Sequence, residues 1–305
     1  MSGINLKVKI GSLELKNPVL LASGTVGYGN EISQFTDLSK IGGIVTKSIS
    51  LKPRKGNPPQ RIVETHGGML NAIGLANVGV EEFINSKIPF LKEVNSTVIC
   101  NIAASSVEEY VECVRILDDI DTIKAYEINV SCPNVKDGGL EFGHNPSAVG
   151  TITGRVRGAT NKPVIIKLSP NVSRISDFAK IVKSEGADAV SAINTLVGTA
   201  FNIWTKKPKI KNITGGLSGP AIKPVALAKV LEISRNVDIP IIGIGGIMNW
   251  QDAVEFMIAG AAAVELGTVN FVNPNAGIEI INGLTEYCEK INIKEIKEII
   301  ASYQL

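Results

Sequence analysis

The sequence is poor in the residues that build metal centres and disulfide frameworks. It has four cysteines and two histidines among 305 residues, and no two cysteines form a C-x-x-C pair. This cysteine usage is typical of a reducing cytosol, and it provides no zinc or iron–sulfur spacing. We therefore expect a cytoplasmic protein whose own chain binds no metal.

Long apolar runs and an excess of one charge are also absent. No stretch approaches the roughly 18 apolar residues that a membrane span needs. The first residues show neither the basic start nor the apolar core of a signal peptide. Lys and Arg number 31 against 29 Asp and Glu, a net charge of +2. Such a balance argues against a nucleic acid or a membrane surface as partner.

Short runs rich in Val and Ile recur along the chain. They cover residues 18–24, 42–48, 97–103, 125–131, 163–169, 187–194, 240–246 and 262–268. Near-continuous apolarity is typical of parallel strands that are buried on both faces. Amphipathic stretches such as 107–118, 175–185 and 223–234 lie between them. About eight strand–helix alternations without a linker predict one α/β domain, residues 1–305, folded as a (β/α)8 TIM barrel.

Three segments fall outside this repeat. Residues 7–15 are predicted to form an N-terminal β-hairpin that covers the bottom of the barrel. Residues 49–77 and 195–219 are rich in Gly, Pro and Asn and follow strands, which predicts inserted functional loops on the catalytic face. The lysine run within 206–211 is interpreted as a solvated loop tip.

Polar side chains recur where the predicted strands end. Five consecutive strands finish at Lys47, Asn101, Asn129, Lys167 and Asn194. Taken singly, each could be a helix cap or a solvated lysine. Barrel enzymes, however, hold their chemistry at the carboxyl ends of the strands. Five such residues in succession predict amides and two cations around a cavity suited to a planar, anionic ligand.

The last two predicted strands end in glycine-containing pairs instead. These pairs are Gly245-Gly246 and Gly267-Thr268. Tight turns would also need glycine. The loops after the seventh and eighth strands of a barrel are a frequent phosphate site, which favours phosphate binding by exposed backbone N–H groups.

One cysteine stands where a predicted strand gives way to a loop. Cys132 follows the run Glu127–Val130 and precedes Pro133, which biases it towards an extended conformation. The other three cysteines fall within strand or helix runs and are interpreted as small buried hydrophobic residues. The asparagines around Cys132 favour chemistry over packing for this thiol.

Together these motifs resemble the class 1 dihydroorotate dehydrogenase family over essentially the whole chain. The resemblance is carried by TKSIS (46–50), NAIGLAN (71–77), INVSCPN (128–134), IKLSP (166–170), INT (193–195), GGLSGPAIKP (215–224), GIGGI (243–247) and LGT (266–268). It implies an FMN enzyme that oxidises (S)-dihydroorotate to orotate in de novo pyrimidine (UMP) biosynthesis.

The resemblance also implies roles for individual residues. Those that match the family's flavin contacts are Ser23, Lys47, Ser48, Asn101, Asn129, Lys167, Ile193, Gly219, Gly245, Gly246, Gly267 and Thr268. Those that match its substrate contacts are Lys47, Asn71, Ala72, Ile73, Gly74, Leu75, Asn129, Asn194 and Thr195. Cys132 matches the catalytic base, which takes a proton from carbon 5 of the substrate while a hydride leaves carbon 6.

Within the family the chain looks most like the class 1B, NAD-linked catalytic subunit. The sequence has neither a dinucleotide fingerprint nor a cysteine cluster for an iron–sulfur centre. The resemblance therefore implies a partner subunit that carries FAD and [2Fe–2S], in a heterotetramer with two copies of each chain. The membrane-associated class differs, because it uses serine as base and has an N-terminal membrane-binding extension.

Several alternatives remain beside this interpretation. They are a fumarate-dependent class 1A homodimer, a flavin reductase of another pyrimidine, a Schiff-base aldolase that uses Lys167, and a non-catalytic scaffold. The chain also departs from the family pattern at His66, at Glu141 and across residues 197–205. The last two departures bear on loop closure or partner contact.

Overall fold

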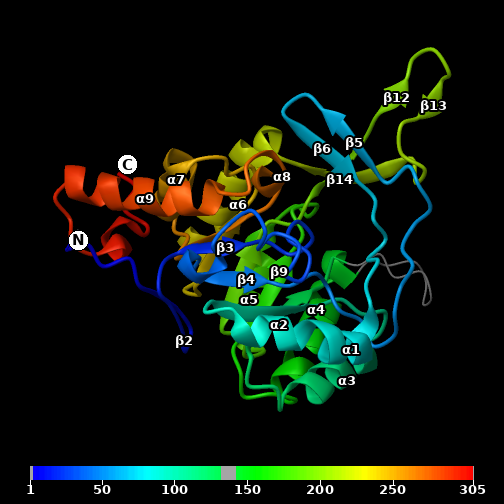
Figure 1. Cartoon of the computed structure of the whole chain (residues 1–305), viewed down its shortest axis with the longest axis horizontal. Helices are drawn as coiled ribbons and strands as arrows, with labels where there is room; N and C mark the ends of the chain where they lie inside the picture. The colour runs from blue at the N-terminus through cyan, green and yellow to red at the C-terminus, as the bar shows by residue number, and fades with distance from the viewer. Residues whose placement is uncertain (1–2, 132–141, 305) are drawn as a thin grey trace.

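The protein is built around a closed barrel of parallel strands, seen in Figure 1, a computed structural model that describes residues 3–131 and 142–304. The barrel strands are β3 (Val19–Leu21), β4 (Gly43–Val45), β7 (Thr97–Ile102), β8 (Ile123–Asn129), β9 (Val164–Leu168), β10 (Ala189–Ala192), β15 (Ile241–Ile244) and β16 (Ala263–Leu266). They close in the order β10-β15-β16-β3-β4-β7-β8-β9. Each predicted run overlaps one of these strands, with β8 beginning two residues before its run, which confirms the (β/α)8 TIM barrel.

The barrel strands are apolar because both of their faces are covered. β9 reads VIIKL and β16 reads AVEL, and every position of both strands is buried. Burial of apolar surface contributes about 25 cal/mol per Å², so such strands are stable only as an inner layer. The charged members of these two strands, Lys167 and Glu265, are therefore exceptions that need a specific partner.

Helices surround the barrel, as Figure 1 shows. They are α1 (Gly79–Glu82), η2 (Phe83–Lys87), α2 (Ile88–Glu93), α3 (Val107–Leu117), α4 (Pro146–Arg157), α5 (Ile175–Ser184), α6 (Lys223–Asn236), α7 (Trp250–Ile258), α8 (Val269–Val272) and α9 (Ala276–Lys290), with short turns η1 (Leu38–Lys40), η3 (Phe142–His144), η4 (Pro220–Ile222) and η5 (Ile296–Ile299). The three predicted helices are confirmed as α3, α5 and α6. α3 begins where the Ser106 hydroxyl accepts from the Glu109 N–H at 3.2 Å. Within the described ranges, none of the helices has the length and apolarity to cross a membrane.

The predicted N-terminal hairpin is present. β1 (Val8–Ile10) pairs antiparallel with β2 (Leu13–Leu15), and the turn holds Gly11 at φ 59°. A Cβ at Gly11 would meet the side chain of Asp188, which directly precedes β10. The hairpin therefore covers the amino ends of the strands, at the bottom of the barrel.

The two inserted segments join into one sheet. β5 (Ile62–Thr65) and β6 (Gly68–Asn71) come from the first segment, and β11 (Leu196–Thr199) and β14 (Thr214–Ser218) from the second. They form a four-stranded antiparallel sheet in the order β11-β14-β6-β5, while β12 (Phe201–Asn202) and β13 (Lys207–Pro208) form a separate hairpin. The inserted functional loops thus contain strands that the sequence patterns did not predict, and Figure 1 places both segments on one side of the barrel.

Replacing Gly68 by alanine should destabilise this added sheet. A Cβ at Gly68 would overlap the backbone oxygen of Ser218, because β6 and β14 approach closely here. We expect Gly68→Ala to lower the free energy of unfolding by about 1–3 kcal/mol, the usual cost of overpacking. Urea denaturation would measure it. Gly3→Ala is the matched control, since nothing lies within 4 Å of a Cβ there. Equal stability of the two variants would contradict the β6–β14 pairing.

Candidate active site

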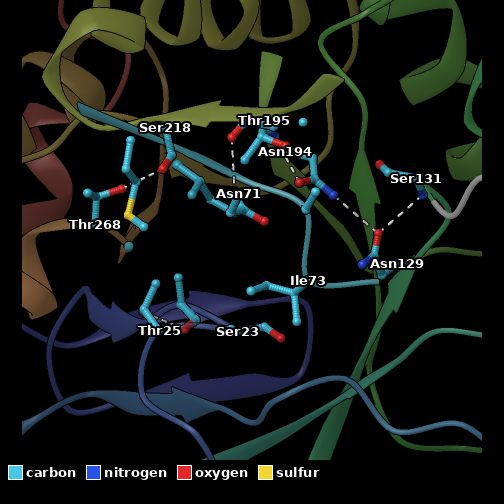
Figure 2. Close-up of a pocket in the computed structure, with 18 of the residues that line it drawn as sticks. Ser23, Thr25, Asn71, Ile73, Asn129, Ser131, Asn194, Thr195, Ser218 and Thr268 are labelled. Atoms are coloured by element: carbon cyan, nitrogen blue, oxygen red, sulfur yellow. Dashed lines mark hydrogen bonds between the residues drawn. The ribbon is translucent and has the colours of Figure 1, made fainter. Parts of the chain in front are cut away.

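A cavity of about 600 Å³ lies at the carboxyl ends of the barrel strands, between the barrel and the added sheet. This volume is in the range of small-molecule and cofactor sites. All residues predicted as cofactor contacts line it, from Ser23 to Thr268, and so do all those predicted as substrate contacts, including the run Asn71–Leu75. Figure 2 shows several of them converging on the same space from different elements.

Glycines line one side of the cavity, where the backbone takes positive φ angles at two positions and is open at a third. Gly245 and Gly246 follow β15 with φ values of 132° and 75°, which other residues rarely adopt. A Cβ at Gly267 would meet nothing within 4 Å, so the backbone beside Thr268 is open to the cavity that both residues line. The Thr268 hydroxyl donates to the Ser218 hydroxyl at 2.8 Å (Figure 2). Hydroxyls and unobstructed N–H groups of this kind can hold a phosphate.

Asparagine side chains gather on another side of the cavity. Asn129 ends β8 and Asn194 follows β10, and the Asn194 Nδ2 donates to the Asn129 Oδ1 at 3.3 Å (Figure 2). The Ser131 N–H donates to the same oxygen at 3.1 Å. Asn71, at the end of β6, donates through Nδ2 to the Gly216 carbonyl at 3.2 Å. The amides are thus oriented by the protein itself, which favours recognition of a ring with several polar atoms.

Lys167 occupies the floor of the cavity inside an ion-pair network. Its Nζ lies 3.3 Å from the Glu127 Oε1 and 3.4 Å from the Glu265 Oε2. Both carboxylates are inside the barrel and at most 1% exposed. Glu127 also accepts hydrogen bonds from the Asn101 Nδ2 at 2.5 Å and the Ser191 Oγ at 2.7 Å.

The three buried groups shift one another's pKa values. Burial opposes a charge on Lys167, but the two carboxylates outweigh it and raise the lysine's pKa. Burial alone would raise the pKa of Glu127, yet the Lys167 ammonium and several hydrogen bonds hold it below its ordinary value. Burial and the charge of Glu127 raise the pKa of Glu265 well above its ordinary value. Of the two acids, Glu265 is therefore the one that takes up a proton more readily, while Glu127 and Lys167 favour their charged forms.

The other predicted cation, Lys47, lies on the cavity wall. Burial lowers its pKa, and the charge of Arg61 adds to this while Glu31 opposes it. An anionic ligand would restore a favourable environment for the ammonium.

The predicted catalytic residue, Cys132, lies outside the described residues, as does Glu141. Ser131, immediately before Cys132, lines the cavity. The chain therefore reaches the cavity one residue before the thiol.

The remaining cysteines are buried, and burial raises the pKa of the Cys100 and Cys113 thiols to about 12. This agrees with their interpretation as packing residues.

Several site residues were missed by the sequence reasoning. Glu127 and Glu265 could have been found, because each is a lone acid inside an otherwise apolar strand run. Ser169 and Asn171 follow β9 and line the cavity, and the Asn171 Nδ2 donates to the Thr195 carbonyl at 3.0 Å.

His66 is exposed in the turn between β5 and β6. Among the described residues, no three His, Cys, Asp or Glu side chains are grouped as a metal would need.

Comparisons with known proteins place these features in a family. The family model for dihydroorotate dehydrogenase matches residues 5–288. The catalytic subunit of dihydroorotate dehydrogenase B (NAD(+)) from Geotalea daltonii is 51% identical over 305 residues, covering 100% of both chains. The subunit of the same name from Trichlorobacter lovleyi is 52% identical over 299 residues, 98% of each chain. That from a Thermoanaerobacter species is 52% identical over 302 residues, 99% of this chain and all of the relative.

Removing the Lys167 charge should destabilise the protein in a pH-dependent way. In Lys167→Met, Glu127 and Glu265 stay buried without a cation, which costs about 3–5 kcal/mol. In the folded variant, the pKa values of Glu127 and Glu265 would then lie above their values in the unfolded chain. The variant's stability is therefore retained at low pH and lost as the pH rises. The stability deficit relative to wild type, from urea denaturation, should be smaller at pH 5 than at pH 8.

The matched control is Lys223→Met. Lys223 pairs with Asp252 at 2.6 Å and Glu255 at 3.1 Å, but its side chain is 25% exposed. Such a pair contributes about 0–1 kcal/mol. A deficit for Lys167→Met that is equally small, or that does not change with pH, would contradict the buried network.

Proposed function

Because the chain belongs to the dihydroorotate dehydrogenase family, we propose that it oxidises (S)-dihydroorotate to orotate in de novo pyrimidine (UMP) biosynthesis, with FMN as its cofactor. The observation that carries this proposal is the single cavity that every predicted cofactor and substrate residue lines. It combines an open glycine backbone, oriented amides and two lysines. These are the groups that a phosphate, a polar ring and a carboxylate require.

The residues of the cavity fit a flavin mononucleotide. The backbone at Gly246 and Gly267 and the Thr268 hydroxyl would hold its phosphate. Asn101 and Lys167 would contact the ring system from the floor. Among the described atoms, the buried Asn101 Oδ1 has no hydrogen-bond partner, so it can accept from a ligand. FMN, when bound, would supply the acceptor for a hydride.

The substrate would lie against the amide side of the cavity. Asn71, Asn129 and Asn194 would bind its ring imide, and Lys47 would bind its carboxylate. Cys132 would take the proton from carbon 5 as the hydride leaves carbon 6. A cysteine thiol has a free pKa of about 8.5 and can act as a base when that value is modestly lowered. The Lys167 ammonium would stabilise the negative charge that develops beside it.

The Lys167 environment argues against the aldolase alternative. A Schiff-base lysine must lose its proton to attack a carbonyl. Although burial opposes the charge, Glu127 and Glu265 raise the pKa of Lys167 and keep its ammonium protonated. The family likewise makes the chain an oxidoreductase.

We further propose that electrons leave the chain for NAD through a second subunit. The relatives are named as NAD(+)-linked catalytic subunits, which supports a partner. The proposed partner carries FAD and [2Fe–2S], and two copies of each chain form a heterotetramer. The proposal includes a cytoplasmic location for this assembly.

Anaerobic addition of dihydroorotate should bleach the yellow, FMN-loaded protein. Cys132→Ala should keep its flavin, while the rate of bleaching falls about 10²–10⁴-fold because the base is lost. The wild-type rate should rise with pH as the thiol loses its proton. Stopped-flow absorbance would measure both. Cys113→Ala is the control, since Cys113 is buried in α3 away from the cavity. An unchanged rate in Cys132→Ala would remove the base assignment.

The chain alone should not reduce NAD+ during turnover, because the proposed route runs through the partner. Reconstitution with a subunit that carries FAD and [2Fe–2S] should produce NADH in equal amount to orotate. Absorbance at the NADH band would follow it. Sustained turnover of the chain alone with fumarate would instead support the class 1A alternative.

A further inference from the structure

Glu127 lies below the cavity floor and accepts hydrogen bonds from three side chains. Its Oε1 accepts from the Asn101 Nδ2 and the Lys167 Nζ, and its Oε2 accepts from the Ser191 Oγ. These donors come from β7, β9 and β10, while Glu127 lies on β8 between them. Glu127 is fully buried and is not one of the cavity-lining residues. It therefore lies beneath the cavity and holds side chains that do line it.

The Asn101 amide has its orientation fixed by this contact. An ionised carboxylate can only accept hydrogen bonds, so the Asn101 nitrogen must face Glu127. The Asn101 oxygen is then directed away from Glu127, and among the described atoms it has no partner despite complete burial. The backbone of Asn101 is fixed as well, because its N–H donates to the Thr46 Oγ1 at 3.2 Å and its carbonyl accepts from the Ile49 N–H at 2.9 Å.

Lys167 differs from Asn101 in having a second carboxyl partner. Its Nζ lies 3.4 Å from the Glu265 Oε2, so its ammonium retains a partner without Glu127. Asn101 has only Glu127 among the described side chains to orient its nitrogen. Loss of the Glu127 charge would therefore act on the cavity chiefly through Asn101.

We propose that Glu127 is a positioning residue that turns the Asn101 amide so that its carbonyl oxygen faces the bound flavin. The inference rests on the proposed function, since the ligand it concerns is FMN. The fixed acceptor matches a ligand edge that carries an N–H group, which the flavin ring has. Glu127 itself touches neither cofactor nor substrate in this role.

The test is a double-mutant cycle with the FMN dissociation constant of the full chain as its readout. Glu127→Gln keeps the shape but offers both an amide oxygen and an amide nitrogen, so the Asn101 amide can turn either way. We expect it to weaken FMN binding about 3- to 10-fold, the effect of a hydrogen bond between two neutral groups, since neither the Asn101 carbonyl nor the flavin N–H is charged. Asn101→Ala should weaken binding by a similar factor. Adding Glu127→Gln to Asn101→Ala should change binding less than twofold, because the residue through which it acts is gone.

A purely structural role would give a different pattern. Glu127→Gln would then weaken FMN binding by the same factor in both backgrounds, and this outcome would overturn the proposal. An unchanged dissociation constant in Glu127→Gln would also overturn it. Glu109→Gln is the matched control: Glu109 accepts from the Ser105 N–H at 2.6 Å and pairs with Arg54, yet it does not line the cavity.

Ser191→Ala provides a second route if Glu127→Gln fails to fold. It removes the 2.7 Å donor to the Glu127 Oε2 without changing a cavity-lining residue. We expect FMN binding to weaken about two- to fivefold, and this effect should vanish in the Asn101→Ala background. An effect of equal size in both backgrounds, or none, would overturn the positioning role.

A wild-type chain that binds no FMN would refute the proposed function and this inference together. Normal FMN binding by the wild type, with variant effects that simply add, would refute this inference alone.

Discussion

Closure of the parallel barrel is the constraint on which the rest of the structure depends. Neighbouring strands run in one direction, so all eight carboxyl ends reach the same rim. The register pairs Asn101 with Glu127 and Asn129 with Lys167, although about 26 to 38 residues separate the members of each pair. Side chains that are distant in sequence therefore become neighbours through backbone hydrogen bonds alone. The cavity, its amides and its glycines follow from this arrangement.

A closed barrel also limits how charge can enter its interior. A lone ammonium below the cavity floor would lose its hydration without compensation. Lys167 consequently comes with Glu127, while burial and the nearby carboxylate raise the pKa of the second acid, Glu265, and so favour its protonated form. The charged and polar side chains of this layer interact with one another, and these interactions offset the free-energy cost of burying each of them. A cation that acts on the cavity thus requires acids beneath it.

The sequence predicted the barrel well because its strands and helices are set by local patterns. Each strand run is apolar over its own few residues, and α3 carries its own cap at Ser106. The rim residues followed from the same reasoning, because a strand end in sequence is a rim position in a barrel. The added sheet could not be predicted in this way. Its contact between Asn71 and Gly216 joins segments 145 residues apart, and no pattern within either segment specifies that register. Glu127 and Glu265 were missed because a charged residue usually indicates solvent.

The walls of the cavity come from two parts of the fold. The barrel provides most of the proposed flavin contacts, and the added sheet provides proposed substrate contacts. Nearly all the proposed flavin contacts, such as Asn101, Lys167 and Gly267, belong to barrel strands or to the residues directly after them. The run Asn71–Leu75, proposed for the substrate, belongs instead to the end of β6 and the segment that follows it. The barrel part is held by a continuous parallel ladder and a dense core, whereas the added sheet depends on a few close backbone approaches at glycine. Sequence changes in the added sheet can therefore alter which ring is accepted above the cofactor, while the barrel preserves the geometry below it.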